Sequence, residues 1–480
     1  MTTFVPADYR PRPLLLMLGE GFFDLVEPAA FPQSELRFRN DRWAERVGLG
    51  ELFEAEWLIH FVNFAPLPGN LRQPHAMRYH GHQFQVYNPN LGDGRGFTFA
   101  QVADAADGRV LDLGTKGSGQ TPWSRAGDGR LTLKGAVREA LATEMLEALG
   151  VYTSKTFSII ETGEALYRGD EPSPTRSAVL VRLSHGHIRI GSFQRLAYYR
   201  DKDRLQRLLD FAVENYLPGI ANAADRPLAF LREVIQRVAE LTASYVAAGF
   251  VHGVLNTDNI NITGESFDYG PWRFAPKFDR NFTAAYFDQG GLYAFGRQPA
   301  AMLWNLQQLA AALMDLAPFK DLLPLLKEFQ PSFAERLDRK VFERLGLKFR
   351  PEGTELVAAI YAFLETSKAG YDQFFFDWYG GLLSEQRAMD SPSAALYASE
   401  EFRPVRKLLA RFSPSHPDRL QDPYFDQRTP CSMLIGEVEA LWAPIADRDD
   451  WRPFTAKIHD IRAMGAALGL KPKVEGHVPL

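Results

Sequence analysis

The chain is poor in cysteine: Cys431 is the one cysteine among its 480 residues. A single thiol excludes an internal disulfide and any zinc site built from several cysteines, and it favours a reducing compartment. Long hydrophobic runs are also missing. The apolar run at residues 14–18 is far shorter than the roughly 20 residues of a membrane span, and it is followed at once by Gly19 and Glu20. We therefore expect a soluble, cytoplasmic protein without a membrane partner.

An excess of positive charge is missing as well, since the formal net charge is -5. This argues against nucleic acid as the main partner, because a phosphate backbone favours a basic face. A hydrophobic content of 46% and a charged content of 24% are typical of a well-cored globular protein. The length allows two or three domains, or one larger unit with extensions.

The stretch at residues 249–270 carries the densest set of polar side chains with chemical potential. It places His252, Asp258 and Asn259 in a short loop, and Asp268 follows in an Asp-Tyr-Gly triplet. Carboxylate and amide oxygens on one side of a hairpin suit Mg²⁺ bound together with a polyphosphate. The alternative is a plain turn, because Asp and Asn side chains commonly bond to local backbone.

This layout resembles the catalytic loop and metal-binding triplet of protein-kinase-like enzymes. In small-molecule kinases such a loop begins His-Gly-Asp and ends on a metal-binding Asn. Here Asn259 falls on the Asn position, but Val254 stands where the usual base would be. The sequence therefore predicts a site that holds a nucleotide and a metal while lacking the ordinary phosphotransfer base.

A lysine and a helix further upstream point to the same chemistry. Lys116 ends a predicted strand at residues 109–115, where it could reach phosphate as a point charge; the alternative is a solvated lysine. The apolar period of residues 131–149 predicts a helix that stops at Gly150. We expect Glu139 of this helix to hold the lysine, with Glu144 as the competing choice.

A glycine-rich turn lies between two predicted strands, at residues 84–87 and 97–102. Gly92 and Gly94 would let backbone N–H groups approach a phosphate without interference from Cβ atoms. The alternative is a hairpin with no role in binding.

Two arginines flank a further turn. Arg182 and Arg189 could face one anion, because a guanidinium matches phosphate oxygens in a bidentate way; the alternative is a pair of surface arginines. Their neighbours His185 and His187 would suit a metal, but no third ligand is apparent.

The remaining elements are predicted from their hydrophobic periods. The strands are expected at residues 156–160 and 178–183. Beyond residue 200 the chain turns helical, with helices at residues 205–216, 228–246, 300–316, 321–329, 331–345, 355–368 and 373–386.

Together these pieces resemble the selenoprotein O family, also called YdiU. The match spans roughly residues 80–310 and is specific because several motifs occur in order. They are GHQF and LGDGR at residues 81–95, GTKGSGQTPWSRAGDGR at 114–130, VRLSHGHIRIGSF at 181–193, FVHGVLNTDNINITGESFDYGP at 250–271, and YAFGRQP with WNLQQLA at 293–310.

The resemblance implies an α+β, bilobal protein-kinase-like fold with a small, mainly β lobe and a larger helical lobe. The expected parts are an N-terminal wrapping extension at residues 1–60, the N-lobe at 61–195, the C-lobe at 196–317 and a helical C-terminal extension at 318–480.

It also implies transfer of AMP from ATP to Ser, Thr or Tyr hydroxyls of client proteins, with release of pyrophosphate. The α-phosphoryl group would be attacked because the nucleotide lies flipped relative to ordinary kinases. Asp258 would be catalytic, and Asn259 and Asp268 would hold Mg²⁺, or Mn²⁺ in its place. The nucleotide would be bound by Gly92, Gly94, Arg95, Lys116, Gly117, Ser118, Asp128, Gly129, Glu139, Arg182 and Arg189. The alternatives are an atypical kinase that transfers the γ-phosphoryl group and a non-catalytic ATP-binding scaffold.

The chain departs from the family pattern in two places. Residues 85–88 replace the Gly- and Trp-containing run that usually follows GHQF, which predicts a different hairpin surface. The chain ends at residues 475–480 without the Cys-x-x-Cys or Cys-x-x-selenocysteine tail of many relatives, so we expect no regulation by an internal disulfide.

Overall fold

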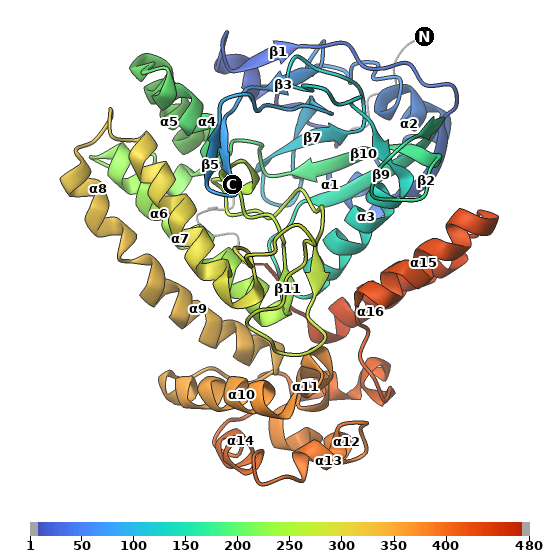
Figure 1. Ribbon diagram of the computed structural model, residues 1–480, viewed down its shortest axis with the longest axis vertical. Coiled ribbons are helices and arrows are strands. Elements are labelled where there is room, and N and C mark those ends of the chain that lie inside the picture. Colours follow the sequence, from blue (N-terminus) through green and yellow to red (C-terminus); the bar gives the residue numbers. More distant parts are fainter. Residues whose placement is uncertain (1–7, 473–480) are drawn as a thin grey trace.

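The computed structural model describes residues 8–472, so the tail at 475–480 lies outside the described residues. Figure 1 shows a β-sheet in the upper part of the molecule, with helices beside and below it. This confirms the expected mixture of α and β structure with an antiparallel sheet. Within the described range no helix is both long and apolar enough to cross a membrane.

An eight-stranded antiparallel sheet organises this upper part. Seven of its strands follow one another in a single path, and the eighth, β8 (Leu131–Thr132), pairs with β10 (Thr175–Ser184) beside that path. The main path runs in the order β1 (Phe23–Leu25), β3 (His75–Met77), β6 (Thr98–Ala103), β7 (Val110–Lys116), β10 (Thr175–Ser184), β9 (Lys155–Leu166) and β2 (Glu35–Arg39).

Residues 8–61 take part in this sheet, because β1 and β2 form its two edges. They also supply α1 (Asp41–Arg46) and α2 (Glu54–Phe61), which cover one face. Trp57 of α2 is fully buried, with its ring 4.9 Å from that of Phe157 on β9. The N-terminal segment therefore closes a hydrophobic core with the sheet.

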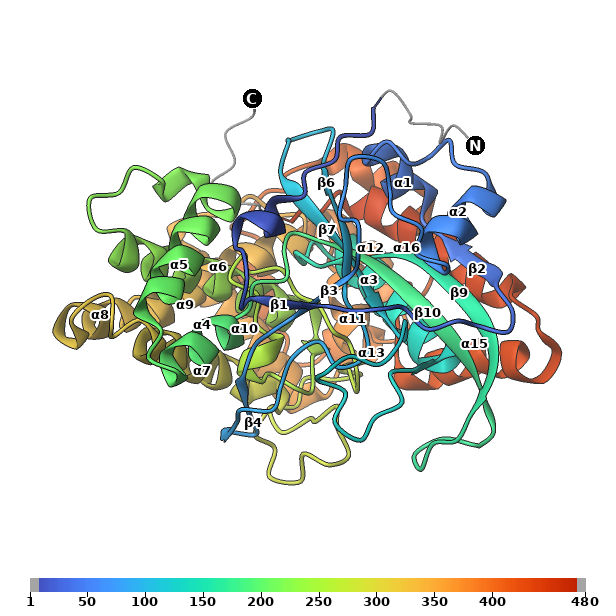
Figure 2. The ribbon, with the colours of Figure 1, turned by 90° about the horizontal axis from the view of Figure 1, so that it is seen from above.

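The opposite face of the sheet packs against α3 (Leu133–Ala148), the helix predicted at residues 131–149. The Thr132 hydroxyl caps it by accepting a hydrogen bond from the Gly135 N–H at 3.1 Å. The last helix, α16 (Arg452–Leu468), packs on α3. Figure 2 shows α16 and α15 (Ile435–Arg448) on the same side of the molecule as β9 and β2.

A helical region follows β10. Its longest helix, α6, ends at Gly249, whose φ of 68° is the left-handed cap that stops the helix. The predicted helices in this region are present, with shifted ends: α5 (Lys202–Tyr216), α6 (Arg226–Ala248), α7 (Gln298–Ala312), α8 (Phe319–Leu326) and α9 (Phe329–Arg344). A further helix, α4 (Ile190–Tyr198), was not predicted from the sequence.

The helix predicted at residues 373–386 is wrong. Gly380 and Gly381 adopt φ values of 88° and 63°, which no right-handed helix accommodates. The chain there forms α11 (Tyr371–Asp377), a short 3-10 turn and α12 (Glu385–Met389). The neighbouring helices are α10 (Thr354–Ser367), α13 (Ala394–Tyr397) and α14 (Arg403–Leu409).

The predicted hairpin around Gly92 and Gly94 is also wrong. Residues 84–87 do not pair with 97–102; the chain turns instead at Phe84 and Gln85, both with positive φ, between β4 (Gly81–Gln83) and β5 (Val86–Asn88). The cause is a two-residue turn built without Gly or Asn, the residues that usually signal it. Residues 89–97 form a long loop instead.

Candidate active site

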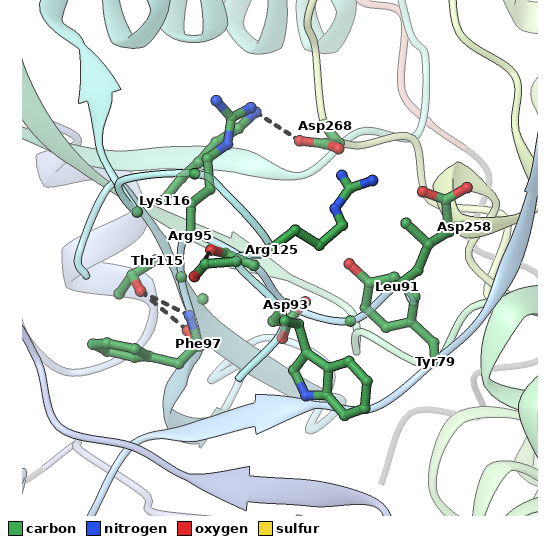
Figure 3. A pocket seen from close by; sticks show the side chains of 18 of the residues that line it. Tyr79, Leu91, Asp93, Arg95, Phe97, Thr115, Lys116, Arg125, Asp258 and Asp268 are labelled. Carbon is green, nitrogen blue, oxygen red and sulfur yellow. Dashed lines mark hydrogen bonds and ion pairs between the residues drawn. The ribbon is translucent and has the colours of Figure 1, made fainter. Parts of the chain in front are cut away.

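A cavity of about 650 Å³ opens between the sheet and the loops that follow α6. Its lining includes most of the expected site residues, namely Gly92, Gly94, Arg95, Lys116, Asp128, Gly129, Arg182, Arg189, Asp258 and Asp268. Figure 3 shows Asp258 and Asp268 along one side of the cavity, with Thr115 and Phe97 on the other. The cavity therefore brings cations from the sheet, from the start of α4 and from neighbouring loops together with the loop carboxylates Asp258 and Asp268.

The register of the central strands puts the cations on one face. Arg182 on β10 pairs with Gly114 on β7, and Lys116 lies two residues further along β7, so both side chains leave the same face. Lys116 Nζ lies 2.7 Å from Glu139 Oε2 and 2.6 Å from Asp268 Oδ1. Glu139 thus joins α3 to the strand lysine.

The competing choice, Glu144, lies elsewhere on α3. Its carboxylate accepts hydrogen bonds from Arg462 of α16, both at 2.8 Å, and from Asn40 at 3.1 Å. It therefore stabilises the packing of α16 and the N-terminal segment on α3.

Arg182 is oriented by a buried chain of polar groups. Its Nε donates to His187 Nε2 at 3.2 Å, and His187 Nδ1 lies 3.0 Å from Asp112 Oδ2. Since an arginine only donates, Nε2 is the acceptor and Nδ1 carries the proton that Asp112 accepts. Burial lowers the pKa of His187, although Asp112 opposes this, so the ring is neutral. Gly114 makes room, because a Cβ there would lie 2.7 Å from the imidazole.

Arg189 lies at the start of α4 and is almost completely buried. Nη1 donates to the Asp258 carbonyl at 3.1 Å, and the guanidinium stacks over the Tyr79 ring at 4.2 Å. Among residues 8–472, Arg189 Nε and Arg182 Nη1 have no hydrogen-bond partner although both atoms are buried. Buried N–H donors without an acceptor are costly, so the cavity is suited to an anion.

Asp258 sits in a 3-10 turn (Thr257–Asn259) that the β4–β5 hairpin fixes. The His82 N–H donates to the Thr257 hydroxyl at 2.7 Å, and the Phe84 N–H donates to Asn256 Oδ1 at 3.1 Å. Burial raises the pKa of the Asp258 carboxyl to about 6, although Arg189 acts in the opposite direction. Its Oδ1 is buried without a partner in the described chain, so this oxygen is free to accept a proton or hydrogen bond.

Asp268 is held in an uncommon backbone conformation, with φ at 64°. His252 fixes the preceding residue, since its Nε2 lies 3.0 Å from the Phe267 carbonyl oxygen. Burial alone would raise the pKa of Asp268, but Lys116, Arg182 and Arg95 outweigh it and hold that pKa well below its usual value. Asp268 is therefore a carboxylate fixed at the edge of the cavity.

Asn259 and Asp268, the residues expected to hold a metal, supply too few ligands to bind it without help from the substrate. In the described chain no group of three or more His, Cys, Asp or Glu side chains converges on one point. Asn259 does not line the cavity, and its amide NH₂ donates to the Val254 carbonyl at 3.0 Å, while within residues 8–472 its amide oxygen accepts no hydrogen bond. One carboxylate and one amide oxygen nevertheless fit Mg²⁺, which takes few protein ligands when phosphate oxygens complete its shell.

The two other histidines do not form a metal site. His187 belongs to the chain with Asp112 and Arg182, and His185 Nδ1 lies 2.7 Å from the Tyr152 hydroxyl. Both residues follow the end of β10 at Ser184.

The glycines near the cavity serve close packing. A Cβ on Gly92 would lie 2.3 Å from the Trp123 ring, and one on Gly94 would lie 2.8 Å from the Trp123 carbonyl. Gly117 and Ser118 are not in the lining; they form a tight turn in which Ser118 Oγ lies 2.6 Å from Thr115 Oγ1. The glycines thus hold the loop of residues 121–130 against the loop of residues 91–96.

Several lining residues were missed from the sequence: Tyr79, Asp93, Trp123 and Arg125. Arg125 and Trp123 belong to the PWSRAGDGR part of the family motif at residues 114–130, so membership of this motif could have identified them as candidate site residues. Neither Arg125 nor Arg95 has an ion-pair partner within residues 8–472, which adds to the positive character of the cavity.

A cavity that combines a lysine–glutamate pair, buried arginines and loop carboxylates is typical of enzymes that act on nucleotide phosphates. A family model described as "Protein adenylyltransferase SelO" matches residues 4–462, and the chain belongs to this family. It is thus an enzyme of the nucleotidyltransferase class.

Relatives in several bacteria carry the name protein nucleotidyltransferase YdiU. One from Gloeobacter violaceus is 46% identical over 472 residues, which is 95% of each chain. One from Synechocystis is 42% identical over 476 residues, covering 94% of this chain and 98% of the relative. One from Vibrio cholerae is 38% identical over 358 residues, or 74% and 72% of the two chains.

Proposed function

We propose that this enzyme transfers AMP from ATP to a Ser, Thr or Tyr hydroxyl of client proteins, with Mg²⁺ bound and pyrophosphate released. The single observation that carries the proposal is the cavity in which Lys116, Arg182 and Arg189 face Asp258 and Asp268. Buried N–H donors without acceptors suit the oxygens of a triphosphate, and the names of the relatives favour transfer of a nucleotide to protein.

In the proposed arrangement, residues 61–195 and 196–317 are the two lobes of a protein-kinase-like fold, and residues 318–480 are its helical extension. The cavity supports this, because its lining comes from the sheet on one side and from the loops after α6 on the other. We place the enzyme in the cytoplasm because a chain with a single cysteine fits a reducing compartment.

The proposed reaction is a single displacement at the α-phosphorus. The acceptor hydroxyl oxygen forms the new bond to phosphorus while the bond to the oxygen that bridges the α- and β-phosphates breaks. Asp258 accepts the hydroxyl proton, and Lys116, Arg182 and Arg189 stabilise the charge that builds on the departing pyrophosphate.

Asp268 and the Asn259 amide oxygen would hold Mg²⁺. When bound, the ion neutralises phosphate charge and fixes the triphosphate in place. Asp268 keeps its negative charge at any working pH, because the nearby cations hold its pKa low. In this proposal the cationic side chains orient the phosphates, and Asp258 in the loop accepts the proton.

The position of a radioactive label in ATP tests this function. The purified protein is incubated with Mg²⁺, a protein acceptor, and ATP labelled at either the α- or the γ-phosphate. Label from the α-phosphate on protein, with pyrophosphate in solution, is the expected result. Label from the γ-phosphate would identify a kinase instead, and ATP binding without transfer from either position to any acceptor would identify a scaffold.

A further inference from the structure

A second cavity of about 660 Å³ continues from the first, because both are lined by Arg95, Lys116, Arg130 and Arg168. Its walls are the first turns of α3, the segments at residues 269–273 and 284–287, and Ile435 and Glu439 of α15. We call it the α3 groove. It leads from the phosphate-binding cavity to the surface between α3 and α15.

Basic side chains outnumber acidic ones in this groove. Glu139, Asp170, Glu171 and Glu439 are its carboxylates, whereas its cations are Arg95, Lys116, Arg130, Lys134, Arg138, Arg168 and Arg273. The chain as a whole carries a net charge of -5. The local excess of positive charge therefore does not follow from composition.

Part of this positive charge is neutralised inside the protein, because Arg130 pairs with Glu164, Arg168 with Asp128, and Lys116 with Glu139 and Asp268. Lys134 pairs with Glu439 at 2.7 Å, while Arg138 donates to the carbonyls of Gly270 and Trp272 at 3.4 and 3.2 Å. Arg273 has no ion-pair partner within residues 8–472. Burial lowers the pKa of Arg138; the nearby Glu439 opposes this shift, and the charge of Arg273 adds to it. Within residues 8–472 neither Arg138 nor Arg273 has an ion-pair partner, and two such neighbouring cations favour an anionic ligand.

Exposed aromatic side chains lie at one wall of the groove. Tyr286 is 78% exposed and Phe287 is 47% exposed. The Phe287 ring is 5.9 Å from Phe84, whose ring is 5.1 Å from that of Tyr293. The Tyr293 hydroxyl in turn donates to Asn256 at 2.7 Å. This wall is therefore coupled through aromatic contacts to the loop that carries the proposed base.

We propose that the α3 groove binds an acidic segment of the client protein, next to the hydroxyl that is modified. The inference rests on the proposed function and adds the chemistry of the preferred acceptor. Aspartate and glutamate side chains would pair with Arg273 and Arg138, and an apolar neighbour would contact Tyr286 and Phe287. A peptide is favoured over nucleic acid because the protein as a whole carries a net charge of -5.

Two matched acceptor peptides test the inference. Both carry one serine in the same apolar context; one has Asp and Glu flanks, and the other has Asn and Gln at those positions. In the transfer assay with α-labelled ATP, wild-type protein should show a kcat/KM roughly tenfold higher for the acidic peptide, and the preference should shrink as salt rises. Equal values for the two peptides would overturn the inference.

Charge reversal in the α3 groove is the second experiment that tests the inference. Arg273→Glu should abolish the preference and leave both ATP affinity and transfer to the neutral peptide unchanged; Arg273→Gln should give an intermediate result. Lys320→Glu, an exposed site on α8, is the matched control and should keep the preference. A loss of activity with both peptides in Arg273→Glu, at normal ATP affinity, would contradict selective docking.

Direct binding separates failure of this inference from failure of the proposed function. Fluorescence anisotropy with a labelled acidic peptide needs no catalysis. Binding that weakens in Arg273→Glu supports the groove even if no AMP is transferred. Binding of a single-stranded oligonucleotide in place of the peptide, with the same dependence on Arg273, would overturn the choice of a protein partner.

Discussion

Replacement of His187 by phenylalanine should slow AMP transfer, because His187 orients Arg182 in the cavity. In residues 8–472, the hydrogen bond that orients the Arg182 guanidinium is the one from Nε to His187 Nε2, at 3.2 Å, and both side chains are buried. A hydrogen bond to a charged group contributes about 1.5–3 kcal/mol. If that energy is used only when Arg182 meets the transition state, its loss lowers kcat by about 10- to 150-fold.

His187→Gln is the matched variant, because its amide oxygen can accept from Arg182 Nε where the imidazole did. Both variants remove the proton that Asp112 accepts, while Asp112 keeps its hydrogen bond from Gln101 at 2.6 Å. The two should therefore lose similar thermal stability, and the difference in kcat between them reports the Arg182 contact alone.

The assay is steady-state transfer of α-label from ATP, together with the Kd for ATP and the thermal midpoint of each variant. We expect His187→Gln to retain most of the activity and His187→Phe to lose it mainly in kcat. Equal activity of the two variants at equal stability would refute the role given to this buried chain.

Further changes test other parts of the site. Gly92→Ala should weaken ATP binding by about tenfold or more, since a Cβ there would lie 2.3 Å from Trp123, whereas Gly436→Ala, with nothing within 4 Å, should have no effect in titration calorimetry. Burial raises the pKa of Glu265 from 4.5 to about 7, so the folded protein binds a proton that the unfolded chain releases, and stability falls as pH rises through that window. Glu265→Gln should therefore raise the melting temperature more at pH 8 than at pH 5; an equal change at both would be inconsistent with this. Chelation of divalent metal should stop AMP transfer and added Mg²⁺ should restore it, because Asp268 needs the ion to engage phosphate; full activity in excess chelator would exclude the metal.

Much of the frame around the cavity could be predicted from hydrophobic period and turn chemistry. The strand that ends at Lys116 and the helix that carries Glu139 gave clear periodic signals and well-marked ends. Their contact could be expected from the kinase-like pairing of a strand lysine with a helix glutamate, and the helical pattern favoured Glu139 because Glu144 lies nearer the apolar face. In the structure Arg462, far along the chain, binds Glu144.

The missed turn and the missed role of His187 have a common physical cause, whereas the helix predicted at residues 373–386 failed at a local Gly-Gly pair. The turn at Phe84 and Gln85 uses positive φ values without Gly or Asn, and tertiary contacts with the loop around Asn256 fix it. Likewise the role of His187 depends on its distance from Asp112 across the sheet. Interactions between residues distant in sequence carry no local pattern, so sequence periodicity cannot report them.

The most direct test of the proposed mechanism compares Asp268→Asn with wild-type protein in the transfer of α-label from ATP. Asparagine keeps the shape of the side chain and removes the charge that would bind Mg²⁺, and Lys116 retains Glu139 as its partner at 2.7 Å. The mechanism predicts that the variant folds, still binds ATP and transfers no label. Transfer at the wild-type rate by a folded Asp268→Asn variant would contradict it.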